Sequence, residues 1–382
     1  MPVLPYSRVV NVTLTRNDNF PTIRSFAIPA LLTSETVAGE LDSTHLSFQA
    51  SSTEEISDAG FSTSGEFYKA ATYAFAQNPS PVLVKALWYD GTNTLAAEMT
   101  SDLDDIINAD SQWYWLTVES GLRDDATLLP GVITWTETKK RQLILDSNDA
   151  NIEDSTDTTN IAYTYKDTVE RTSVFYSQVA AEYNAFGLAG KLGTFDFDVA
   201  NTHYTAKFKG LALTSALDVG SNALSAITGF TPDVGQAAAT GHLANCYIDI
   251  GGQHFVVEGS TLTPNLFIDE IHTTDWIIAR TEETLLGILL NNAAIPMDRR
   301  GMAQLASAPR QVMSIANRAG LIANDFNIST GTIEPSVTYD IPDPLTSITA
   351  AQRNARIAPA ITVRFRYAGA VHYATVNYFM NF

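Results

Sequence analysis

The sequence predicts an α/β unit with mostly parallel strands, followed by an α+β unit. Between residues 21 and 200, short apolar runs alternate with stretches of helical periodicity, a pattern typical of parallel strands joined by right-handed crossovers. After residue 200 a hairpin signal and two long helical stretches follow instead. We therefore predict an N-terminal arm and linker (1–20), an α/β domain (21–200), an α+β domain (201–368) and a C-terminal arm strand (369–382).

The elements of the first unit follow from its apolar pattern. A buried strand is expected within 26–32 and a short strand at 45–49. Thr63 and Glu66 are spaced as a capping box, and the helix behind them should stop before Pro79, because proline disfavours helix in the residue that precedes it. Further strands are expected at 82–90, 113–119, 142–146 and 173–177, and further helices around 95–106, 128–140 and 161–170.

The second unit begins with a predicted hairpin. The strand-like runs NCYIDI and QHFVVE flank Gly251-Gly252, a strong signal for a two-residue turn. One long helix is expected at 274–290 and another from Asp298, a candidate N-cap, to Gly320, a candidate C′ residue. Pro309 should kink or restart that second helix, and ITVRFRYAG and the last residues are expected to form closing strands.

Composition excludes several classes of partner. The net charge of −19 repels phosphate backbones, so we expect no nucleic acid partner. A single cysteine, Cys246, excludes an intramolecular disulfide and a cysteine-based metal site, and it fits assembly in a reducing cytoplasm. No apolar run reaches the roughly 20 residues that span a bilayer, and the N-terminus lacks signal-peptide features, so we expect no membrane insertion.

The charge is spread unevenly. Residues 298–382 contain eight arginines and five acids, a balance of +3, whereas the rest of the chain is strongly acidic. Chance would explain this excess, and so would an acidic neighbour that faces this part of the chain. We favour the acidic neighbour.

Motifs that carry chemistry are missing from the sequence. Gly187, Gly190 and Gly193 lie three apart but do not form GxGxxG, and we interpret them as structural. Asp269, His272 and Asp275 are close in sequence, but a metal site needs convergent ligands, and we interpret Asp275 or a neighbouring threonine as a helix cap. No GxSxG is present. We therefore predict no catalytic, cofactor-binding or metal site, and a protein that is not an enzyme.

The two ends of the sequence read as strands. Residues 9–14 alternate, and the final strand carries apolar bulk on both faces, so its backbone should have neighbours on both edges. The two terminal strands could pair inside their own chain, or each could add to the sheet of another subunit. Composition alone favours pairing inside the chain.

Five stretches resemble contractile-tail sheath proteins of bacteriophages, of the compact myophage type. In order along the chain they are VVNVTLTRND, EFYKAATYAFAQNPSPVLVKALW, NCYIDIGGQHFVVEGST, FIDEIHTTDWIIARTEETLLGILL and IAPAITVRFRYAGAVHYATVNYF. Each is a pattern of general residue types, so their order and spacing over almost the whole chain carry the resemblance. Two features depart from the family: Pro309 interrupts a helix expected to be continuous, and the chain is short for a sheath.

The resemblance implies a viral structural protein. Such proteins form a helical sleeve of stacked rings around a tail tube, and the sleeve shortens to drive the tube through the host envelope for genome ejection. The implied partners are other copies of the chain, the tail tube protein, and baseplate and tail terminator proteins. The implied location is the virion tail, assembled in the host cytoplasm, and no cofactor is implied.

The resemblance also implies roles for residues at both ends. The arms would exchange strands between subunits, with joints at 16–19 and at Gly369, through Val9, Val10, Val12, Leu14, Val371, Tyr373, Val376, Tyr378, Phe379 and Phe382. The α/β domain would lie outermost and the α+β domain innermost. Candidate tube-facing residues are Arg299, Arg300, Arg310 and Arg318. A non-contractile viral tail or tube protein, and an α/β enzyme with an unrecognised site, stay open as alternatives.

Overall fold

The computed structural model describes residues 23–232 and 234–380, which fall into two units. The large unit comprises Arg24–Ile278, Met313–Thr338 and Arg364–Phe382. The small unit is built mainly of Ala279–Val312 and Tyr339–Val363. Within the described residues, no helix is long and apolar enough to cross a membrane.

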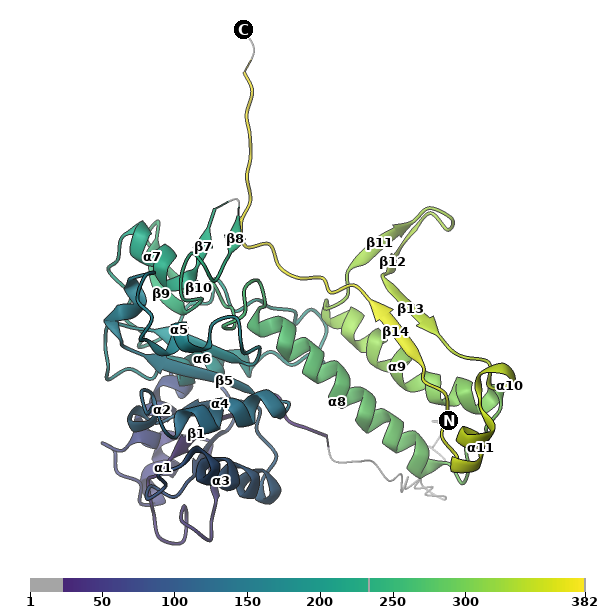
Figure 1. The fold of residues 1–382 in the computed structure, drawn as a ribbon, viewed down its shortest axis with the longest axis horizontal. Helices are drawn as coiled ribbons and strands as arrows, with labels where there is room; N and C mark the ends of the chain where they lie inside the picture. The colour runs from purple at the N-terminus through teal and green to yellow at the C-terminus, as the bar shows by residue number, and fades with distance from the viewer. Residues whose placement is uncertain (1–22, 233, 381–382) are drawn as a thin grey trace, which may run out of the picture. The chain divides into compact units, whose positions relative to one another are not determined.

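An eight-stranded sheet forms the centre of the large unit (Figure 1). β1 pairs in parallel with β3 and β4, and the parallel ladder continues through β5 and β6 to β9, while β2 and β10 lie antiparallel at the edges. The strands are β1 (Pro29–Thr33), β2 (Ser47–Ala50), β3 (Val84–Trp88), β4 (Trp115–Val118), β5 (Gln142–Ser147), β6 (Thr172–Tyr176), β9 (Asn245–Ile250) and β10 (Gln253–Val257). Every residue of the central strands β1, β4, β5 and β6 is buried, as expected for a sheet covered on both faces.

Helices cover the two faces of this sheet and create two apolar cores. Successive residues of β1 face opposite ways: Leu31 packs in one core, and Ala30 and Leu32 pack in the other. The first core contains α1 (Thr53–Asp58) and α2 (Glu66–Phe75), and α6 (Asn184–Leu192) packs there against α2. The second core contains α3 (Ala96–Ala109), α4 (Leu129–Thr138), α5 (Ile161–Tyr165) and α7 (Ser221–Thr228).

The predicted α/β unit with mostly parallel strands is present, but the sheet crosses the boundary that we predicted near residue 200. The predicted hairpin exists, with φ of +67° at Gly251 and +79° at Gly252, and its strands are β9 and β10. β9 pairs in parallel with β6, Tyr176 opposite Cys246. The hairpin therefore extends the first sheet instead of starting a separate one.

Two long helices, two short helices and four short strands follow β10 in the described residues (Figure 1). α8 (Ile268–Asn291) and α9 (Arg299–Ala319) are followed by the hairpin β11 (Asn324–Asn327) and β12 (Thr332–Pro335) and by the pair β13 (Val337–Asp340) and β14 (Thr362–Phe365). Between β13 and β14 lie α10 (Pro344–Ser347) and α11 (Ala350–Ala355). The Asp298 carboxylate accepts from the Gly301 amide at 2.9 Å, and Gly320 has φ +93°, so both predicted ends of α9 are confirmed. α9 runs through Pro309 without a restart.

Three local predictions are wrong, each because distant residues take over a local role. The Thr63–Glu66 capping box does not form: the Glu35 carboxylate accepts from the amides of Glu66 and Phe67 at 2.8 and 2.9 Å. The helix expected at 161–170 ends at Tyr165, because the Asp167 amide donates to the Leu262 carbonyl. The helix expected from 274 begins at Ile268.

Candidate assembly surfaces

The carboxyl edge of the parallel sheet, where α/β proteins usually bind ligands, is occupied by a carboxylate of the chain itself. Glu119, which follows β4 and is buried, lies at the point where the strand order reverses between β1 and β4. The Thr33 and Tyr89 hydroxyls each donate to its carboxylate at 2.6 Å. The amide and hydroxyl of Ser34 donate to it at 3.1 and 2.8 Å. The polar groups at this edge of the sheet therefore hydrogen-bond to one another.

A second buried carboxylate lies at the end of β5. Asp146 accepts from the Ala185 amide at 2.8 Å and lies 3.4 Å from an Arg123 nitrogen. Burial raises the pKa of Asp146 to about 6, although the Arg123 guanidinium opposes the shift. The contact caps the start of α6 and fixes Arg123 over the Tyr183 ring, 4.7 Å from its centroid.

The three spaced glycines allow α6 to pack closely, which agrees with their structural interpretation. A Cβ at Gly190 would lie 3.0 Å from the Cβ of Ala74 on α2, and a Cβ at Gly193 would lie 2.3 Å from the Ala27 carbonyl oxygen. At Gly187 a Cβ would lie 3.2 Å from the side chain of Gln77.

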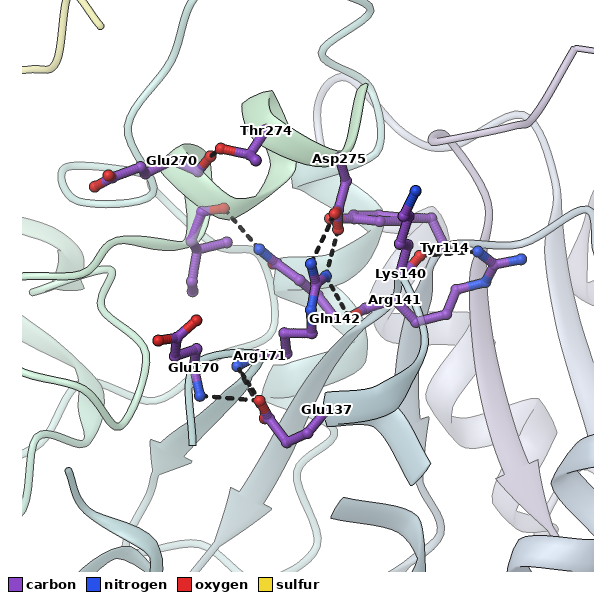
Figure 2. Close-up of polar contacts among 11 residues, drawn as sticks. Tyr114, Glu137, Lys140, Arg141, Gln142, Glu170, Arg171, Glu270, Thr274 and Asp275 are labelled. Atoms are coloured by element: carbon purple, nitrogen blue, oxygen red, sulfur yellow. Dashed lines mark hydrogen bonds and ion pairs between the residues drawn. The ribbon is translucent and has the colours of Figure 1, made fainter. Parts of the chain in front are cut away.

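The first turns of α8 are anchored in the large unit by an ion pair (Figure 2). Arg171 donates to both carboxylate oxygens of Asp275, at 2.5 and 2.8 Å, and the Tyr114 hydroxyl donates to the same carboxylate at 2.8 Å. Glu137 fixes the backbone at Arg171, because its carboxylate accepts a hydrogen bond from the Arg171 amide at 2.9 Å. The Gln142 side-chain amide donates to the Ile268 carbonyl at 2.8 Å. Asp275 is thus a buried partner of Arg171 and not the helix cap that we predicted.

The other two residues of the trio considered as metal ligands, His272 and Asp269, bind separate aromatic partners. The His272 ring contacts the Tyr204 hydroxyl at 2.8 Å, and Asp269 accepts from the Tyr367 hydroxyl at 2.8 Å. Burial lowers the pKa of His272 to about 3 and raises the pKa of Asp269 to about 6. Over residues 23–232 and 234–380, no group of three His, Cys, Asp or Glu side chains is arranged to hold a metal ion.

The four candidate tube-facing arginines do not form one cluster. Arg299 and Arg310 lie in the small unit and, eleven residues apart on α9, share a helix face. Arg299 pairs with Asp343, and the Arg310 guanidinium lies 5.5 Å from the Tyr339 ring centroid. Arg318, in the large unit, donates to the Asp198 carbonyl at 2.9 Å. Arg300 is exposed and makes no ion pair with the described residues.

The predicted C-terminal strand does not form within the single chain. Residues 369–380 contain neither helix nor strand, and the side chains of Val376, Tyr378 and Phe379 are 70%, 92% and 89% exposed. Val371 and Tyr373 are also exposed, and Gly369 has φ +62°. The proposed arm residues Val9, Val10, Val12, Leu14 and Phe382 lie outside the described residues.

The β11–β12 hairpin is a second exposed feature of the large unit. Phe326 pairs directly with Ile333 across the hairpin, so both side chains point to one face, where they are 65% and 74% exposed. An isolated two-stranded sheet is at best marginally stable in water, so this hairpin is a candidate to receive a further strand.

Residues 268–380 match a family model described as the C-terminal domain of the E217 tail sheath protein gp31-like family. The resemblance to contractile-tail sheath proteins is confirmed. A search of curated proteins found no match. The matched sheath domain begins at α8 and includes both long helices, the β11–β12 hairpin and the exposed C-terminal segment.

Solved structures extend the likeness to nearly the whole chain. The helical sheath of the anti-feeding prophage in its contracted state has a TM-score of 0.63 at 12% identity, covering 98% of this chain and 99% of that one. Two baseplate structures of the same prophage, one contracted and one six-fold symmetrised, give TM-scores of 0.64 and 0.58 at 12% and 14% identity. Both matches cover 98% of this chain. They cover 100% of the contracted baseplate chain and 99% of the six-fold symmetrised one. These structures show a shared fold.

The domain matched by residues 268–380 is that of a structural protein, a tail sheath protein, and the chain shares its fold with a contracted helical sheath. Sequence reasoning predicted this class, but it missed Glu119, Arg171 and Tyr367, and the arm and tube-facing residues stay predictions. Glu119 had a visible signal, because it is an acid directly after a buried strand. Arg171 and Tyr367 had none, because their partners lie about a hundred residues away.

Proposed function

We propose that this chain is the subunit of a helical contractile sleeve around a tail tube, and that shortening of the sleeve drives the tube through the host envelope for genome ejection. The match of residues 268–380 to a tail sheath domain carries the proposal. The likeness to a contracted helical sheath and to baseplates supports a ring-stacked homo-oligomer that contacts a baseplate. The sleeve would assemble in the host cytoplasm and also contact the tube and terminator proteins.

In this proposal the arms link neighbouring subunits by strand exchange. The exposed apolar side chains from Val376 to Phe379 support it, because a neighbour's strand would cover them and would pair with their backbone. Each backbone hydrogen bond contributes about 1 kcal/mol net. The β11–β12 hairpin is the acceptor that we favour, since it presents Phe326 and Ile333 beside unpaired strand edges. The N-terminal arm, 9–14, would add to a neighbour in the same way.

Contraction then requires only that the same subunits can pack against one another in two different arrangements. If the shortened packing lies lower in free energy, and a barrier separates the two, many subunits contributing a few kcal/mol each give a large one-way stroke. Arm contacts would persist while the bodies move. The polar groups at the carboxyl edge of the sheet, such as Glu119 and Tyr89, bind one another, which suits a protein that works by packing.

Of the four candidate arginines, Arg300 and Arg310 are the two that we propose to face the tube. Both are exposed, whereas Arg299 is neutralised by Asp343 and Arg318 binds within its own unit. Screened surface pairs contribute little each, which suits a contact that must break during contraction. The α+β domain (201–368), which carries Arg300 and Arg310, would lie innermost, and the α/β domain (21–200) would form most of the exterior.

Electron microscopy of the purified full-length protein tests the sleeve. We expect long helical sleeves, and we expect removal of residues 374–382 to leave a soluble protein with an unchanged unfolding midpoint that forms no sleeves. A matched control, Val82→Ser, alters an exposed apolar residue away from the arm and should leave sleeves intact. Narrow cylinders that never shorten would indicate a non-contractile tube protein, and a small discrete oligomer would overturn the proposal.

Charge reversal tests the tube contact separately. Arg300→Glu with Arg310→Glu should weaken co-sedimentation of sleeves with the tube protein of the same tail at low salt, and less so at high salt, because ions screen exposed charges. The control is Lys69→Glu, an exposed site on α2. If the double reversal leaves the salt titration unchanged, these arginines do not face the tube.

A further inference from the structure

The C-terminal segment divides into a part that is held by contacts within the chain and an exposed apolar part from Val376 to Met380. Ala368 donates its amide to the Leu321 carbonyl at 2.9 Å, and Tyr367 forms an antiparallel bridge with Ile322. Beyond Ala368, apart from Thr375, residues up to 380 make no backbone–backbone hydrogen bond within the described chain. Side chains, however, hold the segment for five residues more.

The first side-chain contact is Tyr367. Its hydroxyl donates to Asp269 at 2.8 Å and lies 3.3 Å from the His203 ring nitrogen. Tyr367 thereby ties the segment to the first turn of α8, and Arg171 binds the same helix at Asp275, six residues further on. Force applied to the C-terminal segment would therefore be transmitted to the sheet through buried polar contacts and not through an exposed loop.

The second contact is His372 with its neighbour Tyr373. The His372 ring is linked to the Thr205 hydroxyl at 2.8 Å and lies against the Phe267 ring, with centroids 4.6 Å apart. The Tyr373 ring lies 6.2 Å from the Phe230 ring centroid. Burial lowers the pKa of His372 to about 4, so the ring is neutral at physiological pH. Between the two contacts, Gly369 takes a left-handed conformation at φ +62°, which favours glycine.

We infer that residues 367–373 are a fixed root of the C-terminal arm that stays on its own subunit, and that the residues from 376 onward are donated to a second copy of this chain. The inference rests on the proposed strand exchange, and it moves the joint from Gly369 to the residues after Tyr373. The donated part is then short, and its apolar residues are Val376, Tyr378, Phe379 and Met380, all exposed in the single chain.

Cross-linking tests the fixed root. In the full chain, Thr205→Cys with His372→Cys is treated with a short bis-maleimide, and the native Cys246 is fully buried and protected from the reagent. We expect a cross-link within one chain, seen as a monomer under denaturing conditions, both before and after sleeve assembly. Each single-cysteine variant is the control and should give no such product.

Three outcomes separate this inference from the proposed function. Dimers that replace the intrachain product in sleeves would overturn the fixed root. So would an intrachain cross-link that blocks assembly when the untreated variant forms sleeves. If the untreated variant and the unmodified protein form no sleeves while the intrachain product forms, the sleeve proposal fails and the root stands.

Hydrogen exchange gives a reading without any substitution. We expect the Ala368 amide to be protected in both soluble protein and sleeves, and the amides of 376–380 to gain protection of at least tenfold on assembly. Loss of protection at Ala368 on assembly, or unchanged fast exchange at 376–380, would overturn the division of the arm.

Discussion

The Arg171–Asp275 pair should be among the most costly contacts to break in the large unit. Asp275 is 1% exposed and holds both Arg171 and the Tyr114 hydroxyl. Asp275→Ala would leave a largely buried guanidinium without its counter-charge, and breaking a buried pair from one side typically costs about 3–5 kcal/mol. At about 1.4 kcal/mol per tenfold change in an equilibrium constant, the folded-to-unfolded ratio should fall by a factor of roughly 10² to 4 × 10³.

Urea unfolding of the soluble protein, followed by tryptophan fluorescence, measures this loss as a shift of midpoint at constant slope. The matched control is Asp325→Ala, which removes an exposed pair with Arg366 and should cost no more than about 1 kcal/mol. Tyr114→Phe removes one hydrogen bond to Asp275 and should cost about 1–2 kcal/mol. If Asp275→Ala costs no more than Asp325→Ala, the pair does not anchor α8.

Two further substitutions probe the interior. Burial raises the pKa of Asp269 from 3.8 to about 6, so the folded state binds more protons between these values and gains stability as pH falls from 7 to 4.5. Asp269→Asn should flatten that gain by about 2 kcal/mol in urea unfolding at the two pH values, and parallel pH profiles would contradict it. Gly193→Ala places a Cβ 2.3 Å from a backbone oxygen and should cost about 1–3 kcal/mol; Gly121→Ala, with nothing within 4 Å, should not, and equal thermal midpoints would refute the packing argument.

Local pattern was sufficient to predict most strands and the ends of α9. Each central strand is a short run of apolar residues, buried on both faces, so its position can be read without its neighbours. α9 ends at Gly320, where a left-handed residue is needed, and it begins after Asp298, whose carboxylate caps the helix. These signals lie within a few residues of the elements that they define.

Predictions failed where the partner of a residue was distant in sequence. The run DEIHTTD looked like a polar junction, yet it forms the first turns of α8, because Arg171, Tyr204 and Tyr367 satisfy its side chains. The position of β9 beside β6 was hidden for the same reason, since about 70 residues separate the two strands. In the proposed strand exchange the arm pairs with another copy of the chain, and a single chain would not display it paired.

The place of β9 in the sheet has a consequence for synthesis of the protein. β6 ends at Tyr176, and the strand that covers its outer edge begins at Asn245. At roughly 5–20 residues per second, that edge waits on the order of 4–14 s on the ribosome before β9 is made. During this interval the uncovered edge can pair with other strands, so the order of synthesis exposes this part of the sheet to mispairing that the finished fold prevents.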